Sequence, residues 1–412
     1  MRKTDAIIIG AGQAGLAMSY CLGSLGIDHI VLERGNVAER WRSERWDSLR
    51  LLTPNWMNRL PGWWYRGDDP DGFMPGSELL SFLEGYAKDS GAPVITGSAV
   101  LSVRRIPGGY RVESERGTWN CRCVVIATGH CDAPFVPTMA ARLAAGIRQL
   151  TPTIYRNPQA LPEGGVLVVG ASASGVQLAE EIQKSGREVT LSVGRHTRLP
   201  RMYRGQDIMW WLDAQTTLEG EFATSTELKD ARSQPSLQLV GRPAPAELNL
   251  GVLRDSGVRL VGRMLDIDRG VASLNDDLRL NVAESHARML RLLHRIDPLA
   301  DMDEAQVEAP PAPFDVPEAP ATLHLADHRI RTVIWATGFR RNYRWLHVPV
   351  VDACGEIIQT GGVTPAPGLY VTGIRFMRRR DASFIAAVAG DSTALAAHIQ
   401  RHLDATRPSA AA

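Results

Sequence analysis

Apolar and polar positions in the first part of the chain follow the order of a strand, a tight turn, a helix and a second strand. Residues 6–9 form a short apolar run that a glycine-rich turn follows at once, residues 16–25 have the spacing of a helix, and residues 29–32 form a second apolar run. A continuous apolar run of this length is typical of a strand buried on both faces, as in a parallel sheet. The pattern therefore predicts a strand–helix–strand unit over residues 5–34.

The same order returns near the middle of the chain. Residues 166–169 and 189–193 are apolar runs, a turn of small residues follows the first run, and residues 176–185 between them have helical spacing. This second unit covers residues 165–198. Strands that alternate with helices in this way predict an α/β protein with parallel sheets.

Both halves of the chain also contain a strand-like segment that ends in Ala-Thr-Gly. The two triplets are Ala127-Thr128-Gly129 and Ala336-Thr337-Gly338. Because each half has one glycine-rich turn followed by one such triplet, we expect two Rossmann-like dinucleotide-binding domains, with the second inserted into the first. The predicted boundaries are 1–160 and 326–412 for the first domain and 161–325 for the second.

The inserted domain contains two further patterns. Residues 276–294 have apolar positions spaced as on one face of a helix, and residues 303–321 are rich in Pro, Ala and acidic residues, which is typical of a loop or lid. The second domain is therefore expected to carry a helical and Pro-rich insertion.

The first glycine-rich turn, residues 10–15, matches the pattern G-x-G-x-x-G between a predicted strand and a predicted helix. In this context Gly10 permits the tight turn, Gly12 lets a pyrophosphate approach the backbone, and Gly15 lets the helix pack on the strand. Glu33 lies 21 residues after Gly12, where an acid binds ribose hydroxyls and repels a 2′-phosphate. The site is therefore predicted to bind FAD or NAD, with further contacts from Gln13, Ala14 and Arg34.

The second turn, residues 170–175, keeps the pattern except at Ser172, which stands where the second glycine is expected. The position equivalent to Glu33 is Val193, and the basic segment 194–201 follows it. Cations at this place can pair with a 2′-phosphate, and an arginine can do so with two hydrogen bonds. The second site is therefore predicted to bind NADPH through Gly170, Ser172, Ala173, Ser174 and Gly175, and to hold the 2′-phosphate with Arg195, His196 and Arg198.

Together these motifs resemble those of the class B flavin-dependent monooxygenases, the superfamily of flavin-containing monooxygenases, Baeyer–Villiger monooxygenases and plant YUCCA-type enzymes. The resemblance extends over nearly the whole chain. It rests on both glycine turns, both Ala-Thr-Gly triplets, the Trp-rich segments 39–42 and 46–54, Tyr155-Arg156-Asn157-Pro158, and residues 368–373. Two positions depart from the family pattern: Leu150 stands where the family signature has His, and Ala173 where its second turn often has Asn.

The resemblance implies that FAD occupies the first domain and NADPH the inserted one. It implies that Trp41, Arg42 and Thr53 approach the flavin. It also implies that backbone near Val100 meets the adenine, and that a late helix beginning near Ser383 points at the isoalloxazine. The remaining expected cofactor contacts are Ala127, Thr128, Gly129, Thr337 and Gly338.

Several other chemistries lack their residues in this sequence. The hydrolase pattern G-x-S-x-G fails at Ser174, and the ten histidines show no metal-ligand spacing. Cys121 and Cys123 form C-x-C on a predicted strand, which favours packing over a redox pair. The net charge of +1 does not favour a nucleic-acid partner, and no apolar stretch of about 18 residues predicts a membrane span.

The leading hypothesis is an NADPH-dependent FAD monooxygenase that inserts one atom of O₂ into a small organic substrate, with the oxygen carried as a C4a-(hydro)peroxide of the flavin. The sequence assigns it no catalytic residue. A flavin reductase or dehydrogenase without oxygen insertion, and a cofactor-binding sensor, are the alternatives. Five cysteines without disulfide spacing favour a cytoplasmic protein, and a homodimer is one assembly to test.

Overall fold

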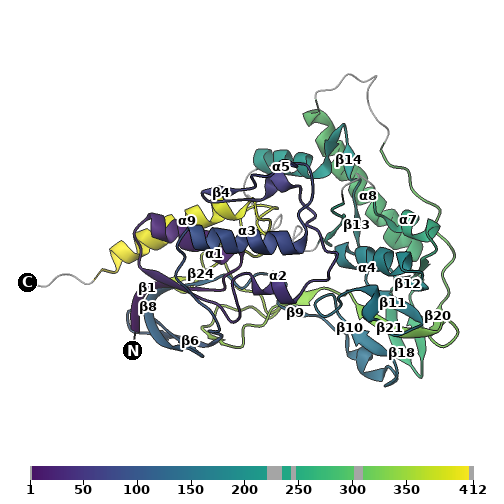
Figure 1. The fold of residues 1–412 in the computed structure, drawn as a ribbon, viewed down its shortest axis with the longest axis horizontal. Coiled ribbons are helices and arrows are strands. Elements are labelled where there is room, and N and C mark those ends of the chain that lie inside the picture. Colours follow the sequence, from purple (N-terminus) through teal and green to yellow (C-terminus); the bar gives the residue numbers. More distant parts are fainter. Residues whose placement is uncertain (1, 220–233, 243–246, 301–309, 408–412) are drawn as a thin grey trace, which may run out of the picture.

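Two α/β domains lie side by side in the computed structural model, which describes residues 2–219, 234–242, 247–300 and 310–407 (Figure 1). The first domain is built from both ends of the chain, because α1 (Gln13–Ser24) packs against α9 (Val388–Ala405). The second domain is formed by the middle of the chain. The predicted α/β architecture with an inserted second domain is confirmed.

An eight-stranded sheet forms the centre of the first domain, in the order β23-β6-β7-β8-β1-β2-β5, with β24 also paired to β8. Its strands are β1 (Arg2–Ile9), β2 (His29–Leu32), β5 (Val94–Ile95), β6 (Val100–Ile106), β7 (Gly109–Ser114), β8 (Gly117–Ile126), β23 (Leu346–His347) and β24 (Leu369–Val371). β1 pairs in parallel with β2 and β8, and β24 pairs in parallel with the last residues of β8. The carboxyl ends of β2, β1, β8 and β24 therefore meet at one edge of the sheet, in that order.

A five-stranded sheet, parallel throughout, forms the centre of the second domain. Its order is β10-β21-β11-β12-β17, with bounds β10 (Arg148–Leu150), β21 (Ile330–Trp335), β11 (Gly165–Val169), β12 (Val189–Ser192) and β17 (Arg259–Val261). β10 and β21 lie outside the range 161–325 that the sequence predicts for this domain. Strands of one parallel sheet share the layers that cover its two faces. β10 and β21 therefore belong to the same domain as β11, with which β21 pairs. We propose that the second domain runs between the two crossings of the chain described next.

A short antiparallel ribbon carries the chain between the domains. It pairs β9 (Ala133–Pro134) on the way out with β22 (Phe339–Arg340) on the way back. The Phe135 N–H donates to the Gly338 carbonyl at 2.8 Å, and the Thr337 hydroxyl donates to the Phe135 carbonyl. The second Ala-Thr-Gly triplet thus ends in the interdomain connection.

The remaining helices cover the two sheets and build an additional lobe. In the first domain these are α2 (Glu39–Ser43), the 3-10 turn η1 (Asn55–Met57) and α3 (Gly76–Asp89), with the hairpin β3 (Arg59–Leu60) and β4 (Trp63–Trp64). In the second they are η2 (Thr138–Arg142), η3 (Pro158–Ala160), α4 (Ala173–Lys184) and α7 (Leu250–Asp255), with the antiparallel strands β18 (Met264–Asp268), β19 (Val271–Leu274) and β20 (Thr322–His324). None of the described helices is both long and apolar enough to cross a membrane.

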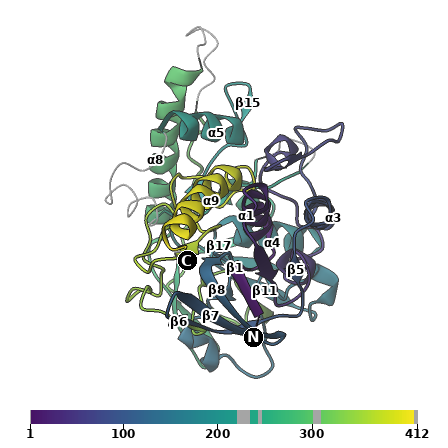
Figure 2. The same cartoon turned by 90° about the vertical axis from the view of Figure 1, so that its left-hand side faces the viewer.

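The lobe stands above the body of the molecule in Figures 1 and 2. It contains α5 (Ile208–Glu219), α8 (Leu278–Ile296), η4 (Asp297–Leu299) and the short pairs β13 (Thr197–Arg198) with β16 (Leu237–Gln238) and β14 (Met202–Tyr203) with β15 (Gln206–Asp207). Met289, Leu293 and Ile296 of α8 are buried in its core. The amphipathic helix predicted near 276–294 is therefore confirmed.

Three expectations differ from the structure or lie partly beyond it. The helix α1 begins at Gln13, earlier than the predicted 16, because it starts directly from the glycine turn. The last helix begins at Val388, after turns that include Ser383, so no helix starts near Ser383. Residues 303–309 of the Pro-rich stretch lie outside the described residues, and residues 310–320 have no regular secondary structure.

Replacement of Gly15 with Ala should destabilise the first domain. A Cβ atom there would lie 1.9 Å from the Gly10 carbonyl oxygen, so the helix would have to move away from its strand. We expect a cost of about 1–3 kcal/mol and a lower melting temperature in far-UV circular dichroism.

Gly390→Ala is the matched control, because a Cβ atom at Gly390 meets nothing within 4 Å and the residue lies in α9. Alanine in a helix is favoured over glycine by at most about 1 kcal/mol, so this variant should keep or raise the melting temperature. Equal melting temperatures for the Gly15→Ala variant and the wild type would contradict the predicted contact.

Candidate dinucleotide and substrate cavity

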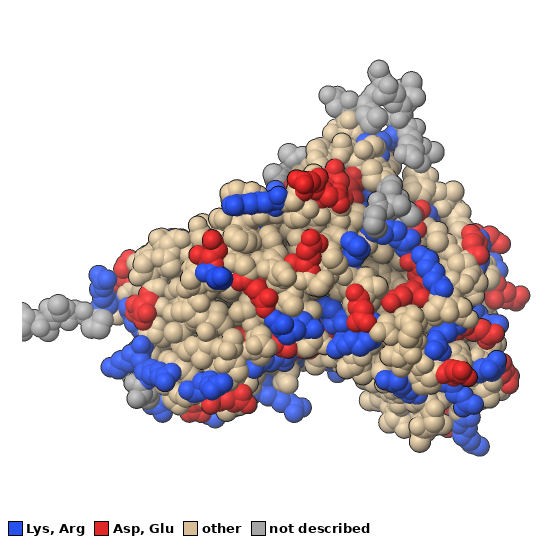
Figure 3. Space-filling view, viewed as in Figure 1, with Lys and Arg blue, Asp and Glu red and all other residues tan. Residues whose placement is uncertain are grey.

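One continuous cavity of about 1800 Å³ lies between the domains and the α5–α8 lobe. Pockets for a single drug-sized ligand usually enclose roughly 300–1,000 Å³. The cavity therefore has room for more than one such ligand. On the face shown in Figure 3, side chains of both charges meet at the centre of the molecule, where the domains join.

The first glycine turn has the geometry of a pyrophosphate cradle. Gly10 has φ +107°, and a Cβ atom there would lie 2.7 Å from the Ala127 carbonyl oxygen. Gly15 packs against Gly10, whereas a Cβ atom at Gly12 would meet nothing within 4 Å. Gly10 and Gly15 thus shape the turn, and Gly12 leaves open space in front of the N-terminus of α1. A helix N-terminus with free N–H groups is suited to bind phosphate.

Glu33 stands at the carboxyl end of β2, beside this turn. Its side chain is buried, and its two oxygens accept hydrogen bonds from the Ala11 N–H at 2.7 Å and the Gly35 N–H at 3.0 Å. These bonds hold the carboxylate at the cavity wall, where it can accept bonds from ribose hydroxyls. The residues present therefore fit the FAD site that the sequence predicts.

The second turn repeats the first. Gly170 has φ +108°, and a Cβ atom there would lie 2.4 Å from the Ala336 carbonyl oxygen. A Cβ atom at Gly175 would lie 1.8 Å from the Gly170 oxygen. In each domain, the alanine of the Ala-Thr-Gly triplet thus packs against the first glycine of the turn.

Ser172 fits the place of the missing glycine without backbone strain. Its φ and ψ are −82° and −171°, and those of Gly12 are −83° and −173°. This extended conformation is open to any residue, so the turn does not require glycine for its backbone. Its hydroxyl makes no capping bond to the helix. The departure from the pattern leaves the turn geometry intact.

The basic segment after β12 contains one exposed arginine, Arg195, and three buried basic side chains, of which Arg201 pairs with Asp207. Arg195 is exposed, whereas the Arg198 guanidinium donates to Glu247 at 3.1 Å and to the Ala312 carbonyl at 2.9 Å. His196 is buried with Nδ1 2.9 Å from the Gly194 carbonyl oxygen, and burial lowers the pKa of its imidazole to about 4. His196 is thus uncharged at pH 7. Only Arg195 keeps its cation available to a 2′-phosphate.

The Trp-rich loop of the first domain, residues 44–54 between α2 and η1, is held by Arg156 and Asn157 of the second domain. Arg156 donates to the carbonyls of Arg45, at 2.8 Å, and Ser43, and its own carbonyl accepts from the Asp47 N–H at 3.0 Å. The Asn157 amide donates to the Asp47 carboxylate at 2.6 Å. These bonds fix the loop between the domains, so that its neighbouring residues line the cavity.

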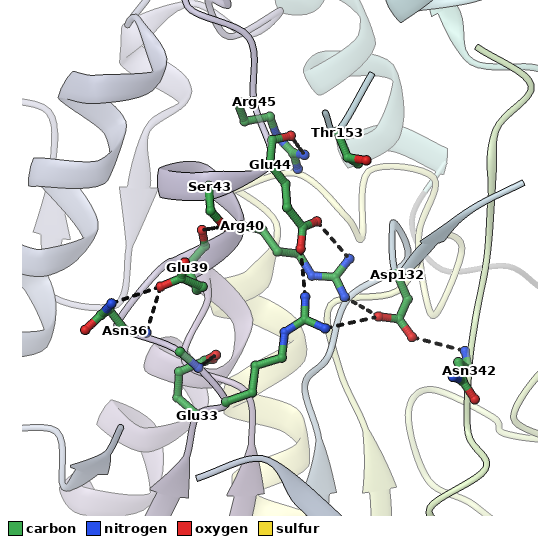
Figure 4. Close-up of polar contacts among 12 residues, drawn as sticks. Glu33, Asn36, Glu39, Arg40, Ser43, Glu44, Arg45, Asp132, Thr153 and Asn342 are labelled. Carbon is green, nitrogen blue, oxygen red and sulfur yellow. Dashed lines mark hydrogen bonds and ion pairs between the residues drawn. The ribbon is translucent and has the colours of Figure 1, made fainter. Parts of the chain in front are cut away.

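Charged residues join α2 to the interdomain connection (Figure 4). Asp132 pairs with Arg40 and accepts from the Asn342 N–H at 3.1 Å. Glu44 pairs with Arg34 at 2.8 Å and lies 4.0 Å from Arg40. The network ties the start of the connection, beside β9, to its end, beside β22.

Most predicted site residues meet at this one cavity. Its wall includes Gly10, Gly12, Gln13, Ala14, Glu33, Arg34, Trp41, Thr53, Val100, Ala127, Thr128, Gly129, Ala173, Ser174 and Ser383. The other predicted residues lie off it: Gly15, Gly170, Ser172 and Gly175 form the turns, Thr337 and Gly338 lie in the connection, and Arg195, His196 and Arg198 follow β12. Arg42 also lies off the wall, because its exposed side chain pairs with Glu84 of α3.

Further residues of the wall were missed in the sequence. His130, Cys131 and Asp132 follow the first Ala-Thr-Gly triplet directly, Arg45 belongs to the Trp-rich loop, and Arg375 follows β24. Residues just past the carboxyl ends of parallel strands line ligand sites in open α/β sheets. Applied to β8 and β24, this rule could have identified His130, Cys131, Asp132 and Arg375 from the sequence.

Comparisons with known proteins agree with this geometry. The family model for pyridine nucleotide-disulphide oxidoreductases matches residues 7–219. An uncharacterized oxidoreductase (CzcO-like) of Geobacillus kaustophilus is 31% identical over 97% of this chain and 99% of its own length. The probable indole-3-pyruvate monooxygenase YUCCA1 of Arabidopsis thaliana is 30% identical over 48% of this chain and 46% of its own.

A solved structure extends the likeness to the whole fold. A flavin-containing monooxygenase from Stenotrophomonas maltophilia superposes with a TM-score of 0.66 at 19% identity, covering 98% of this chain and 99% of that one. Relatives of these kinds use FAD and NADPH, the two cofactors predicted from the sequence.

Replacement of Gly12 with Val should weaken FAD binding without unfolding the protein. The new side chain would fill the open space in front of α1, where nothing lies within 4 Å of a Cβ atom. We expect the dissociation constant for FAD to rise at least about tenfold, or ~1.4 kcal/mol, in titrations of the apoprotein followed by flavin fluorescence.

The control is Gly146→Val, at an exposed glycine that also has open space but lies off the cavity. Unchanged FAD affinity in the Gly12→Val variant would show that the pyrophosphate binds elsewhere.

Proposed function

The chain belongs to the pyridine nucleotide-disulphide oxidoreductase family and to the class B flavin monooxygenase-type superfamily that its motifs resemble, and from this we propose that it is an NADPH-dependent FAD monooxygenase. It is an oxidoreductase. The proposal adds the transfer of one atom of O₂ to a small organic substrate. YUCCA enzymes, which match about half of the chain, are named as monooxygenases of indole-3-pyruvate, and this supports oxygen transfer as the type of reaction.

The observation that carries the proposal is the meeting of both nucleotide turns at one cavity. Gly12 and Ala14 of the first turn line it from one side, and Ala173 and Ser174 of the second from the other. Two dinucleotides bound at these turns can bring a nicotinamide to a flavin, as hydride transfer requires. FAD held at the first turn would supply the redox chemistry, namely acceptance of a hydride and activation of O₂.

The protein's own contribution is to bind, orient and exclude water. Leu51 and Met57 are buried residues of the cavity wall, and their apolar side chains keep water from the reacting centre. All five cysteines are free: Cys121 and Cys123 are buried on β8 away from the cavity, and Cys131 is the one cysteine on the described cavity wall. This arrangement favours oxygen transfer over disulfide reduction. We also propose a cytoplasmic location, where such free cysteines stay reduced.

Oxygen transfer should appear directly in the products. Purified enzyme with NADPH and ¹⁸O₂ should place one ¹⁸O atom in an organic product when offered a panel of ketones, amines and sulfides, as read by mass spectrometry. Consumption of NADPH with hydrogen peroxide as the sole oxygen product, across the panel and at every pH tried, would instead support the flavin reductase alternative.

Arg195→Ala should reduce the preference for NADPH. The exposed guanidinium after β12 is placed to bind the 2′-phosphate, and one charge-assisted contact is worth roughly 1.5–3 kcal/mol. The KM for NADPH should therefore rise about tenfold to a hundredfold, with little change in the KM for NADH.

Arg198→Ala provides the comparison, because this buried arginine is paired with Glu247. That variant should lower the melting temperature and affect both cofactors alike. If Arg195→Ala changed the two KM values equally, Arg195 would not contact the 2′-phosphate.

A further inference from the structure

Two arginines line the cavity beside the loop that follows β8. Arg45 comes from the Trp-rich loop and stacks on Trp41, with its guanidinium carbon 4.8 Å from the ring centroid. Arg375 comes from the turn after β24 and lies over the ring of Phe376 at 4.7 Å. Both act electrostatically on Cys131, which lies between the carboxyl end of β8 and the interdomain ribbon. The two cations thus belong to one part of the wall.

The order of the strands places this part at the flavin end of the FAD site. Glu33 follows β2 and would hold the ribose of a bound FAD, and the glycine turn follows β1 and would hold its pyrophosphate. β8 and β24 come next along the same edge. A dinucleotide that runs from β2 across β1 carries its flavin toward the loops after β8 and β24. The phosphate sites of NADPH belong instead to the second domain, at Ser174 and Arg195.

Neither arginine forms a salt bridge with a carboxylate among the described residues, although the Glu44 carboxylate attracts Arg45 electrostatically. Arg45 donates to the backbone carbonyl of Glu44 at 2.8 Å, and Arg375, within the described part of the chain, makes a long hydrogen bond to the Gln234 carbonyl at 3.4 Å. The nearby carboxylates have other partners, since Glu44 pairs with Arg34 and Asp132 with Arg40.

The carboxylates elsewhere on the wall are also engaged. Asp213 pairs with Arg59, Asp297 with Arg204 and Asp381 with Arg379, at distances from 2.8 to 3.2 Å. Glu39 is held by Asn36, and Glu33 by the backbone. Each carboxylate described on the wall therefore already has a partner other than Arg45 or Arg375.

The surroundings increase the affinity of this place for an anion. Burial lowers the pKa of both guanidinium groups, although arginine stays charged in proteins. Burial, together with four neighbouring arginines, lowers the pKa of His130 to about 3, so the imidazole adds no charge at pH 7. A partly desolvated cation gains much from a bound anion, because attraction is stronger where water is excluded.

The backbone beside Arg375 is strained. Phe376 has φ +54°, a left-handed conformation that is uncommon for a bulky residue and costs energy to maintain. Its side chain is buried and lines the cavity together with Leu52 and Phe384. The arginines are thus next to an apolar surface.

We propose that Arg375 and Arg45 bind the carboxylate of the substrate, so that the substrate is a small organic acid whose apolar part lies against Phe376 and Phe384. This inference rests on the proposed function, because it assigns the substrate class of that same cavity. The assignment gives the two arginines a positioning role: they orient the acid toward the flavin and take no part in the transfer of oxygen.

Binding tests the site without any turnover. Benzoate, a carboxylate without a ketone, amine or sulfide group, should perturb the absorbance spectrum of the oxidised holoenzyme with saturation. Benzamide, its neutral analogue, should bind much more weakly. Arg375→Gln should raise the dissociation constant for benzoate about tenfold to a hundredfold, the effect of one charge-assisted bond. Arg45→Gln should act in the same direction.

The charge control is Arg344→Gln, at an exposed arginine off the main cavity, which should leave benzoate binding unchanged. Retention of FAD, measured by the ratio of flavin to protein absorbance, shows whether each variant is folded. Arg45→Gln removes a side chain that stacks on Trp41 and could cost the protein its FAD. In that case the Arg375→Gln variant alone decides the test.

Turnover tests the substrate class. (Phenylthio)acetic acid and its methyl ester share the same sulfide and differ in charge, so the acid should be oxygenated with a lower KM. Arg375→Gln should raise the KM for the acid and leave that for the ester unchanged, with similar kcat values. Equal changes for acid and ester would overturn the proposal.

The outcomes separate this inference from the proposed function. Oxygenation of the ester with no benzoate effect would keep the monooxygenase and reject the acid site. Benzoate binding that depends on Arg375, with no ¹⁸O in any product, would keep the acid site and reject the monooxygenase. If Arg375→Gln instead raised the dissociation constant for NADP⁺, or shifted the flavin midpoint potential, while benzoate binding stayed the same, the charge would serve a cofactor and the proposal would fail.

Discussion

The approach of a helix to its own strand at each glycine turn determines where the chemistry of this protein can take place. The hypothetical Cβ atoms of Gly15 and Gly175 lie 1.9 and 1.8 Å from the carbonyl oxygens of Gly10 and Gly170. Only glycine allows the helices α1 and α4 to start so close to the strands. The first free N–H groups of each helix then face the cavity, where they can bind phosphate. Ala127 and Ala336, which precede the two Thr-Gly pairs, pack against the first glycines of the turns and leave no room for a side chain there.

Two such turns share one cavity because the loop between α2 and η1 is held between the domains. Arg156 and Asn157 bind its backbone and Asp47, while Trp46 is buried in the core of the second domain. The hypothetical Cβ atom of Gly241, in the lobe, lies only 1.9 Å from the Leu51 carbonyl oxygen. The loop is therefore fixed at both ends and from both domains. This explains why Trp41, Arg45 and Thr53 reach a wall that Ala173 and Ser174 also form.

The sequence allowed prediction of the features that local patterns determine. Apolar runs located β1, β2, β11 and β12, and the glycine spacing predicted a helix after each turn, because both signals depend on neighbouring residues. Both helices begin three residues earlier than predicted, at Gln13 and Ala173. The extent of the second domain could not be predicted in this way, since β10 and β21 join their sheet through pairing across long stretches of chain. Contacts between distant parts of the chain also decide the site, as the basic segment 194–201 shows. Arg195 and Arg198 are alike in sequence, but the distant Glu247 and Ala312 engage Arg198 and leave Arg195 exposed.

The distribution of charge on the cavity wall distinguishes residues that maintain the structure from those available to a ligand. Asp132 and Glu44, with Arg34 and Arg40, form a network that joins α2 to the interdomain connection, and an incoming anion would have to break it. Arg45 and Arg375 take part in no such network with a carboxylate among the described residues. A half-buried cation without a counter-ion has lost part of its hydration without gaining an ion pair. The strained backbone at Phe376 has a cost as well. Both costs fall beside the loops after β8 and β24, where we propose that the flavin binds, so an anionic ligand bound there would offset them at the proposed reacting centre.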